Sequence, residues 1–391
     1  SARLVRPIAA LVGWPLARAG VPGQLVRENA VRNPARTAAT AAALMIGLAL
    51  VTFVAVLGTG LGDTARSNVR EQVAASHVVV STNDWDPMPA GVARAVAAGH
   101  PGAVVSAVRE DRALVEGAQA TVSGVEPSTI ARVHDFAWAA GSDASLRELA
   151  AGGAVVTERF ADDHGLAVGS PVHITTPSGE RIARTVTGVF DQPALVPVLG
   201  SVLISQDAFD GAFPRAKDRL ALVAGAQGGT AGIERSLADF PDAMVLTEAG
   251  FAEERARDLS TVLNMLYVLL ALSVVVSVFG MVNTMVLAVH ERTRELGMLR
   301  AVGMTRRQAR RMVRGESAVT ALIGAAVGLP LGVGIAWLAT RAMSEWGVAM
   351  AVPVAPLAAF VVAAVLVGVV AAVAPARRAS RLDVLRALQY E

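Results

Sequence analysis

Hydrophobic residues gather in four stretches of the chain, each long enough to cross a lipid bilayer as a helix. They occupy residues 38–60, 261–289, 318–340 and 353–374, and about 20 apolar residues are enough to span the hydrocarbon core. A block of mixed character, residues 61–260, separates the first stretch from the second. The pattern predicts a multi-pass α-helical membrane protein with four transmembrane helices and one large domain outside the bilayer.

The large block alternates short apolar runs with helical stretches and turn signals. Strands are expected at residues 77–81, 103–108, 120–125, 154–157, 171–176, 184–189, 201–204 and 220–223. Helices are expected at residues 89–98, 145–150, 157–164, 206–213 and 230–240. This alternation is typical of an α+β domain. Residues 248–289 contain no proline and read as one long helix, whose polar start would form a stalk outside the bilayer.

Small residues recur at helical spacing in three of the predicted spans. They are Ala39, Ala43 and Gly47 in the first span, Ser273 and Ser277 in the second, and Gly324, Gly328 and Gly332 in the third. Small side chains let two helix backbones approach closely in a membrane. We therefore expect these faces to be helix-packing faces.

The segment between the second and third spans, residues 290–317, is strongly basic. Its eight arginines are Arg292, Arg294, Arg300, Arg306, Arg307, Arg310, Arg311 and Arg314. Arginine-rich connections between spans lie on the cytoplasmic side. The segments 1–37 and 375–391 are basic as well. Both termini are therefore expected in the cytoplasm, and the large domain outside it, in a bacterial cell membrane. Residues 1–37 read either as an amphipathic interfacial helix or as a linker, and residues 341–352 as a short external loop.

The basic segment also has the local sequence of an elbow. Residues 289–302 have helical character, with Arg292 and Glu295 at the i,i+3 spacing of an ion pair. Gly303 can end that helix in a left-handed conformation. Thr305 and Gln308 have the spacing of a capping box that begins another helix. We expect two helices joined by a sharp turn, the second of which re-enters the membrane.

An acidic residue, Glu316, lies at the edge of the third span. Such residues are expensive inside a membrane unless they are paired. We expect Glu316 to pair with Arg311, with Arg314 or with a neighbouring chain, and proton transport is the alternative.

The run Glu291-Arg292-x-x-Glu295-Leu296-Gly297-x-Leu299-Arg300-Ala301-x-Gly303 resembles the signature of FtsX-like ABC permeases, the group that includes MacB and the LolC/LolE proteins. In that family this elbow is the coupling element that docks on a separate ATPase subunit. The resemblance implies ATPase coupling for Glu291, Arg292, Glu295, Leu296, Gly297, Leu299, Arg300 and Gly303. The alternative is a solvated loop that fixes the topology and binds nothing.

Two further passages are similar to the same family. Residues 155–174 resemble the strand, helix, glycine turn and strand of MacB-like periplasmic domains, and residues 375–388 resemble the terminal segment. Val384 stands in that terminal segment where proline is frequent. The resemblance covers essentially the full chain and implies a MacB-like α+β domain between the first and second spans.

Composition excludes several kinds of chemistry. The chain has no cysteine, and Lys217 is its only lysine. Because Lys217 lacks the glycines and the following Ser or Thr of a Walker A loop, we expect no ATP hydrolysis here; ATP and Mg²⁺ would bind to the partner ATPase dimer. The histidines have no metal-ligand spacing, and no nucleophile motif appears. No catalytic, cofactor-binding or metal-binding residue is therefore expected in this chain, and no nucleic-acid partner, since the arginines cluster beside apolar spans.

The expected function is that of an ABC transporter permease subunit. It would transmit motion from the ATPase to the extracytoplasmic domain, for export or for handling lipids and lipoproteins. The alternatives are an FtsX-like regulator that activates a cell-wall hydrolase and a membrane receptor or scaffold. Because the sequence starts at Ser1 and four spans offer little helix surface, we expect either a longer permease or pairing with a second permease unit, as a homodimer or a heterodimer.

Overall fold

The computed structural model describes residues 34–83, 86–214 and 217–380. Most of the predicted segment 1–37 and the end of the segment 375–391 lie outside the described residues. The chain divides into two compact units, each considered by itself. The helical unit holds the residues up to 61, residues 259–344 and those from 349 onward, and the sheet domain holds residues 62–258 and 345–348.

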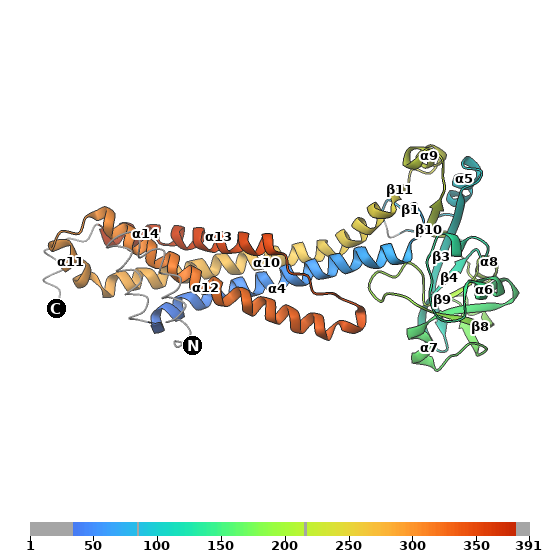
Figure 1. Cartoon of the computed structure of the whole chain (residues 1–391), viewed down its shortest axis with the longest axis horizontal. Helices are drawn as coiled ribbons and strands as arrows, with labels where there is room; N and C mark the ends of the chain where they lie inside the picture. Colours follow the sequence, from blue (N-terminus) through green and yellow to red (C-terminus); the bar gives the residue numbers. More distant parts are fainter. Residues whose placement is uncertain (1–33, 84–85, 215–216, 381–391) are drawn as a thin grey trace. The chain divides into compact units, whose positions relative to one another are not determined.

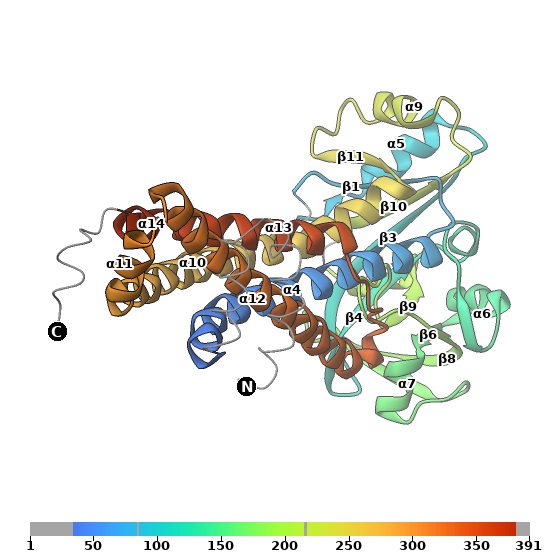
Figure 2. The ribbon, with the colours of Figure 1, turned by 60° about the vertical axis from the view of Figure 1, so that its left-hand side comes forward.

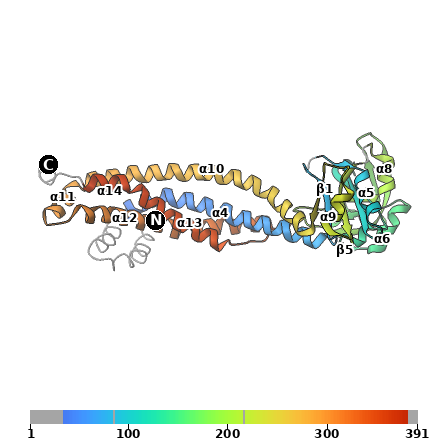
Figure 3. The same ribbon diagram turned by 90° about the horizontal axis from the view of Figure 1, so that it is seen from above.

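The helical unit is built from long apolar helices that run along one another (Figures 1 and 3). These are α4 (Pro34–Gln72), α10 (Glu248–Glu291), α12 (Arg306–Ala342) and α13 (Val354–Ala371). Each of the four is long and apolar enough to cross a membrane. Two short helices, α11 (Thr293–Ala301) and α14 (Val373–Ser380), lie together at one end of the unit, and the short helix η3 (Ser344–Trp346) follows α12.

Two of these helices extend beyond the predicted spans. α4 continues past residue 60 to Gln72. α10 is continuous from Glu248 to Glu291, as predicted for residues 248–289. Their outer ends belong to the sheet domain.

The predicted glycine stripe of α12 lies against α4. In order, the three glycines face carbonyl oxygens of α4: Gly324 with Ala41, Gly328 with Met45, and Gly332 with Ala49. A Cβ atom placed on Gly328 would be 2.7 Å from the Met45 oxygen, which is closer than real Cβ contacts. Only glycine permits this approach of the two backbones.

The predicted stripe of α10 makes fewer contacts. A Cβ atom on Gly47 of α4 would lie 3.4 Å from Val274 Cγ2 and 3.9 Å from the Ser277 hydroxyl. Ser273 is exposed, and its carbonyl accepts a 3.0 Å hydrogen bond from the Ser277 hydroxyl. Ser277 therefore lies near α4, while Ser273 faces away from the described helices.

One mixed sheet organises the other unit (Figure 2). Its strands are β1 (His77–Ser81), β2 (Met88–Pro89), β3 (Val104–Val115), β4 (Ala118–Val125), β5 (Ala137–Ala140), β6 (Gly153–Thr157), β7 (Pro171–Thr175), β8 (Arg181–Asp191), β9 (Val202–Ser205), β10 (Lys217–Ala224) and β11 (Ala243–Thr247). The order is β11-β1-β10-β3-β4-β9-β6-β8-β5, with β2 paired to β10 and β7 paired to β3 and β8. Strand β9 therefore lies between β4, to which it is parallel, and β6.

Helices complete the sheet domain. They are α5 (Gly91–Gly99), η1 (Ile130–Arg132), α6 (Asp143–Arg147), η2 (Glu148–Ala151), α7 (Glu158–His164), α8 (Gln206–Ala212) and α9 (Gly229–Ser236). Each of the eight predicted strands overlaps an observed one, whereas β2, β5 and β11 were not predicted. The predicted fold class, four transmembrane helices with an α+β domain, agrees with the four long apolar helices and the mixed sheet with its helices.

Candidate functional site

The elbow begins at a break between α10 and α11. Arg292 has φ −102° and ψ 18°, outside the helical region, and a new helix, α11, begins at Thr293. The prediction of one continuous helix over residues 289–302 is therefore wrong. The Thr293 hydroxyl donates to the His290 carbonyl at 2.7 Å, which satisfies an acceptor left free by the break.

A sharp turn separates α11 from α12, as predicted. Gly303 has φ +114°, which favours glycine. Its amide donates to the Arg300 carbonyl at 3.1 Å, and the Met304 amide donates to the Leu299 carbonyl at 2.9 Å. The Thr305 hydroxyl then accepts from the Gln308 amide at 3.3 Å, while Gln308 Oε1 accepts from the Thr305 amide at 2.8 Å. The capping box is confirmed, and the start of α12 is fixed on both sides.

An ion pair closes the elbow across its two arms. Arg292 Nη1 lies 3.4 Å from Glu316 Oε1 on α12, and the side chain of Arg292 is only 16% exposed. The predicted partner Glu295 is farther away, at 3.9 Å, and is 68% exposed. Arg292 is not one of the two arginines, Arg311 and Arg314, that the sequence suggested as partners of Glu316. It lies on the other side of the turn, directly before α11. Arg292 therefore holds the geometry of the elbow from inside.

The tip of the elbow presents apolar side chains to the outside. Val302 is 90% exposed, Met298 47% and Leu299 37%. Glu291, Glu295 and Gly303 are exposed around them, Arg300 is half-buried and Gly297 is buried, while the side chain of Leu296 is not described. Sequence reasoning missed Met298 and Val302, although their i,i+4 spacing next to Leu299 indicates a shared face. The tip is a small apolar surface with charged residues around it.

The base of the elbow is tied to α13. The Ser317 hydroxyl, which is fully buried, donates to the Gly368 carbonyl at 2.5 Å. A Cβ atom on Gly368 would lie 2.8 Å from Ala321 Cβ, so α12 and α13 are in close contact there. Ser317 and Gly368 therefore join α12 to α13 at the base of the elbow.

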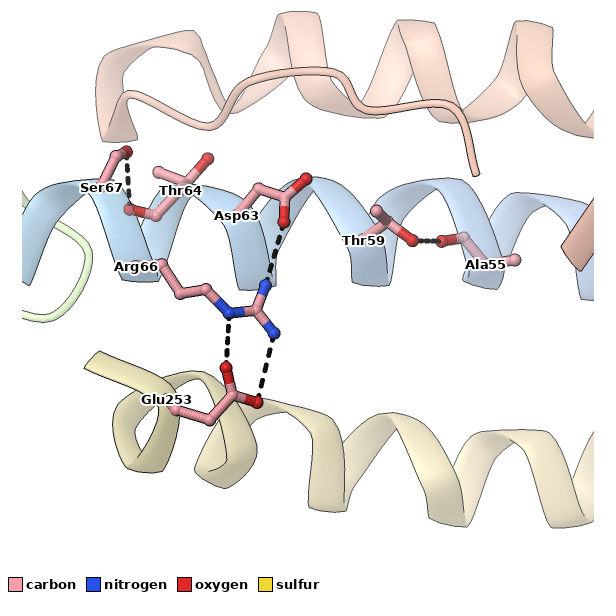
Figure 4. A network of polar contacts seen from close by, with 7 residues as sticks. All are labelled: Ala55, Thr59, Asp63, Thr64, Arg66, Ser67 and Glu253. Carbon is pink, nitrogen blue, oxygen red and sulfur yellow. Dashed lines mark hydrogen bonds and ion pairs between the residues drawn. The ribbon is translucent and has the colours of Figure 1, made fainter. Parts of the chain in front are cut away.

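At the other end of the long helices, an arginine joins α4 to α10 (Figure 4). Arg66 Nε donates to Glu253 Oε2 at 2.8 Å and Nη2 donates to Oε1 at 3.4 Å, which makes a two-point pair. Arg66 Nη1 also donates to Asp63 at 2.9 Å. A forked guanidinium pair of this kind fixes orientation as well as distance. The two helices are thereby held in register where they enter the sheet domain.

Ionisable groups are buried inside the sheet. Asp218 is fully buried and pairs with Arg109, whose second partner is Asp210. Burial raises the pKa of Asp218, against the lowering effect of Arg109. Burial likewise raises the pKa of Glu110, which lies 3.4 Å from Arg219. All of these groups except Asp210, which lies on α8, occur on β3 and β10, where charged residues obscure the alternating pattern of a strand.

His134 is a buried histidine beside the last residues of α4. It is 2% exposed, forms a bridge with Val73 and contacts the Phe136 ring at a centroid distance of 4.5 Å. Neither ring nitrogen has a hydrogen-bond partner among the described residues. Burial lowers the pKa of His134 to about 3. Protonation of this ring therefore opposes folding.

We expect the chain to lose about 2 kcal/mol of stability through His134 between pH 7 and pH 5. The pKa of the folded state lies below the unfolded value of about 6.5. The contribution is therefore complete above pH 6.5 and is lost as the pH falls toward 3. Denaturant unfolding of the full chain at both pH values should show that the parent loses about 2 kcal/mol more than His134→Leu does. An identical pH dependence in the two proteins would contradict the assignment.

The sheet domain also carries an open hollow of about 560 Å³. Its lining includes Glu126, Asp143, Asp207 and Arg147. Among the described residues, no group of three histidine, aspartate or glutamate side chains is placed to hold a metal ion.

Two family models match most of this chain. The FtsX-like permease C-terminal family matches residues 267–384, and the MacB-like periplasmic core domain family matches residues 37–242. The extracellular domain of the noncanonic ABC-type transporter YknZ from Gram-positive bacteria is 12% identical, with a TM-score of 0.33, and the match covers 44% of this chain and 98% of that one.

Curated relatives are similar over different lengths. The macrolide export ATP-binding/permease protein MacB of Chromobacterium violaceum is 28% identical over 390 residues, which covers 92% of this chain and 59% of that protein. The pyoverdine export ATP-binding/permease protein PvdT of Pseudomonas putida is 33% identical over 150 residues, covering 38% of this chain and 22% of that one. The chain thus spans little more than half the length of the first relative. Since the MacB-like match alone takes in more than half of the chain, the protein belongs to the family of FtsX-like permeases with a MacB-like periplasmic core domain.

Proposed function

We propose that this chain couples an ABC ATPase to its own periplasmic-type domain, and that the elbow is the docking element. The observation that carries the proposal is the exposed tip formed by Met298, Leu299 and Val302, of which Val302 is 90% exposed. An apolar cluster with a charged rim is typical of a protein-binding surface. A topology anchor needs arginine but has no use for such a tip.

The way the tip is mounted supports docking. Gly303 and the capping box of α12 fix the turn, and the Arg292–Glu316 pair ties its two arms together. α12 is one helix from Arg306 to Ala342, with Pro330 inside it. A push on the tip would therefore pass along α12 and, through the Ser317–Gly368 contact, to α13.

We place the ATP-binding domain outside the described residues. The names of the relatives join ATP-binding and permease functions in one protein. The ATPase would accordingly be either a separate subunit, as the sequence suggested, or another part of the same polypeptide. The export named for macrolides and pyoverdine in these relatives supports export here, in preference to regulation of a cell-wall hydrolase. With the ATPase on the cytoplasmic side, both ends of this chain would lie there as well.

We expect a cysteine placed at Val302 to form a cross-link to the ATPase. The chain has no cysteine of its own, so a single Val302→Cys carries the only thiol. A matched control is Val168→Cys, another exposed valine, at 52%, in the sheet domain. A short thiol-reactive photo-cross-linker in native membranes should link the first variant, not the second, to an ATP-binding domain identified by mass spectrometry. Equal labelling of both, or none at Val302, would overturn the docking role.

A further inference from the structure

The last turns of α4 bury two polar side chains in the sheet domain. Asn68 is 8% exposed and Gln72 is 3% exposed. Four residues apart on one helix, they lie on the same face. Buried amides are costly unless their polar atoms are bonded, so their partners show what this part of the helix holds.

Both amides bind one segment, residues 192–200, between β8 and β9. Asn68 Nδ2 donates to the Leu195 carbonyl at 2.8 Å. Gln72 Nε2 donates to the Val196 carbonyl at 3.3 Å, and Gln72 Oε1 accepts from the Val198 amide at 3.0 Å. Gln72 Nε2 also donates to the Asn68 carbonyl at 2.8 Å. Every polar atom of the Gln72 amide group is thereby used.

The segment is held in an unfavourable conformation. Val196 has φ +58°, in the left-handed region. A β-branched residue there is a genuine outlier, and such a backbone persists only where its surroundings impose it. The hydrogen bonds from α4 fall on both sides of this residue. They constrain the backbone around Val196, together with the hydrogen bond from Gln192 Nε2 to the Leu199 carbonyl at 2.8 Å.

The far end of the segment is fixed to the middle of the sheet. The Gly200 amide donates to the Ser123 hydroxyl at 2.8 Å, and a Cβ atom on Gly200 would lie 2.6 Å from the Thr121 carbonyl oxygen. The Ser123 hydroxyl in turn donates to Glu110 at 3.3 Å. Two residues beyond Gly200 the chain enters β9. Residues 192–200, called the strap from here on, thus link the end of α4 to the central strand β9.

We propose that Asn68 and Gln72 are positioning residues that couple α4 to the central strands of the sheet. While α4 keeps its place, they hold the strap in its strained form. When α4 shifts or rotates, the three hydrogen bonds break, Val196 relaxes, and β9 is released. The inference rests on the proposed function, because it needs ATP to drive a movement of α4.

Hydrogen–deuterium exchange on the full chain with its ATPase tests the coupling, with and without a non-hydrolysable ATP analogue. In the parent, the Val198 amide should exchange faster once the analogue binds. Gln72→Met keeps the length of the side chain and removes its hydrogen bonds. Exchange at Val198 should then be about ten-fold faster in both states, as expected for loss of one buried hydrogen bond, and its response to nucleotide should vanish. Glu71→Gln, on the exposed neighbour, should behave as the parent.

Hydrogen–deuterium exchange at residues 293–304, which hold α11 and the turn of the elbow, distinguishes a failure of this inference from a failure of the proposed function. If the elbow responds to nucleotide in the parent while residues 192–200 do not, the strap is a static support and the inference falls alone. If the elbow fails to respond as well, the proposed function falls with it. A Gln72→Met variant that keeps a parent-like response at Val198 would also overturn the role of the amides, and the parent measurement decides the matter even where the variant does not fold.

Discussion

Replacing Gly328 with leucine should separate α12 from α4 and destabilise the helical unit by about 3 kcal/mol, the upper end for overpacking. The first added carbon would already lie 2.7 Å from the Met45 oxygen and 3.2 Å from Leu48 Cβ. The Met45 oxygen belongs to the backbone of a helix, so it cannot rotate aside as the end of a side chain could. Relief would require the whole of α12 to move outward, with loss of the contacts at Gly324 and Gly332.

The same helix offers a matched control for this prediction. A Cβ atom on Gly334 meets no described atom within 4 Å. Gly334→Leu therefore adds the same side chain and the same helix propensity without the collision. Thermal unfolding and size-exclusion profiles of the full chain in detergent should separate Gly328→Leu from both the parent and Gly334→Leu. Similar behaviour of the two variants would mean that the stripe does not pack on α4 in the membrane.

The spacing of glycines predicted a close approach but could not name the partner. The small residues expected to form the packing face of the first span include Gly47, which lies against α10, near Val274 and Ser277. The face that meets α12 is instead defined by backbone oxygens, at Ala41, Met45 and Ala49. Any residue has a carbonyl oxygen, so no pattern of side chains marks this face.

The second half of β3, which extends beyond the predicted residues 103–108, was hidden in the sequence for a physical reason. β3 continues from Arg109 to Val115 through a run of charges, because Arg109 is buried with Asp218 on the neighbouring β10. That partner is 109 residues away in the chain. The order of strands in the sheet likewise depends on distant pairings, such as β1 with both β10 and β11. Local periodicity carries no information about either.

The elbow was predicted where its geometry is local and mispredicted where it is not. Gly303, Thr305 and Gln308 act on neighbours within a few residues, and their roles followed from spacing alone. The break at Arg292 was not predicted, and the contact that Arg292 makes there is with Glu316, which is 24 residues away. Exposure of the tip depends on how α11 packs, which a single sequence does not reveal.

Replacing Gly303 with valine should abolish coupled ATP hydrolysis while leaving membrane insertion intact. A β-branched residue at φ +114° is strongly disfavoured. The turn must then open, with loss of the hydrogen bonds to the Arg300 and Leu299 carbonyls. The tip would leave its place on the ATPase, whereas every arginine that sets the topology remains. We expect association with the ATPase to fall at least about ten-fold, which corresponds to about 1.4 kcal/mol, and coupled hydrolysis to be lost.

Glu295→Arg should have the same effect by another route. Glu295 is 68% exposed on the rim of the tip, and reversing its charge leaves the backbone of the elbow undisturbed while placing a repulsive group in the docking surface.

The control for Gly303→Val is Gly347→Val, which imposes a similar strain at φ +68° in the loop after α12, far from the elbow in the chain. Co-purification of the ATPase, its hydrolysis rate and a protease-protection assay of topology should be measured on all three variants. Loss in both elbow variants, with Gly347→Val unaffected, is expected because docking needs both the turn and the rim. Full ATPase binding and activity in the two elbow variants would reduce the elbow to a cytoplasmic anchor, whatever the exposure of its tip.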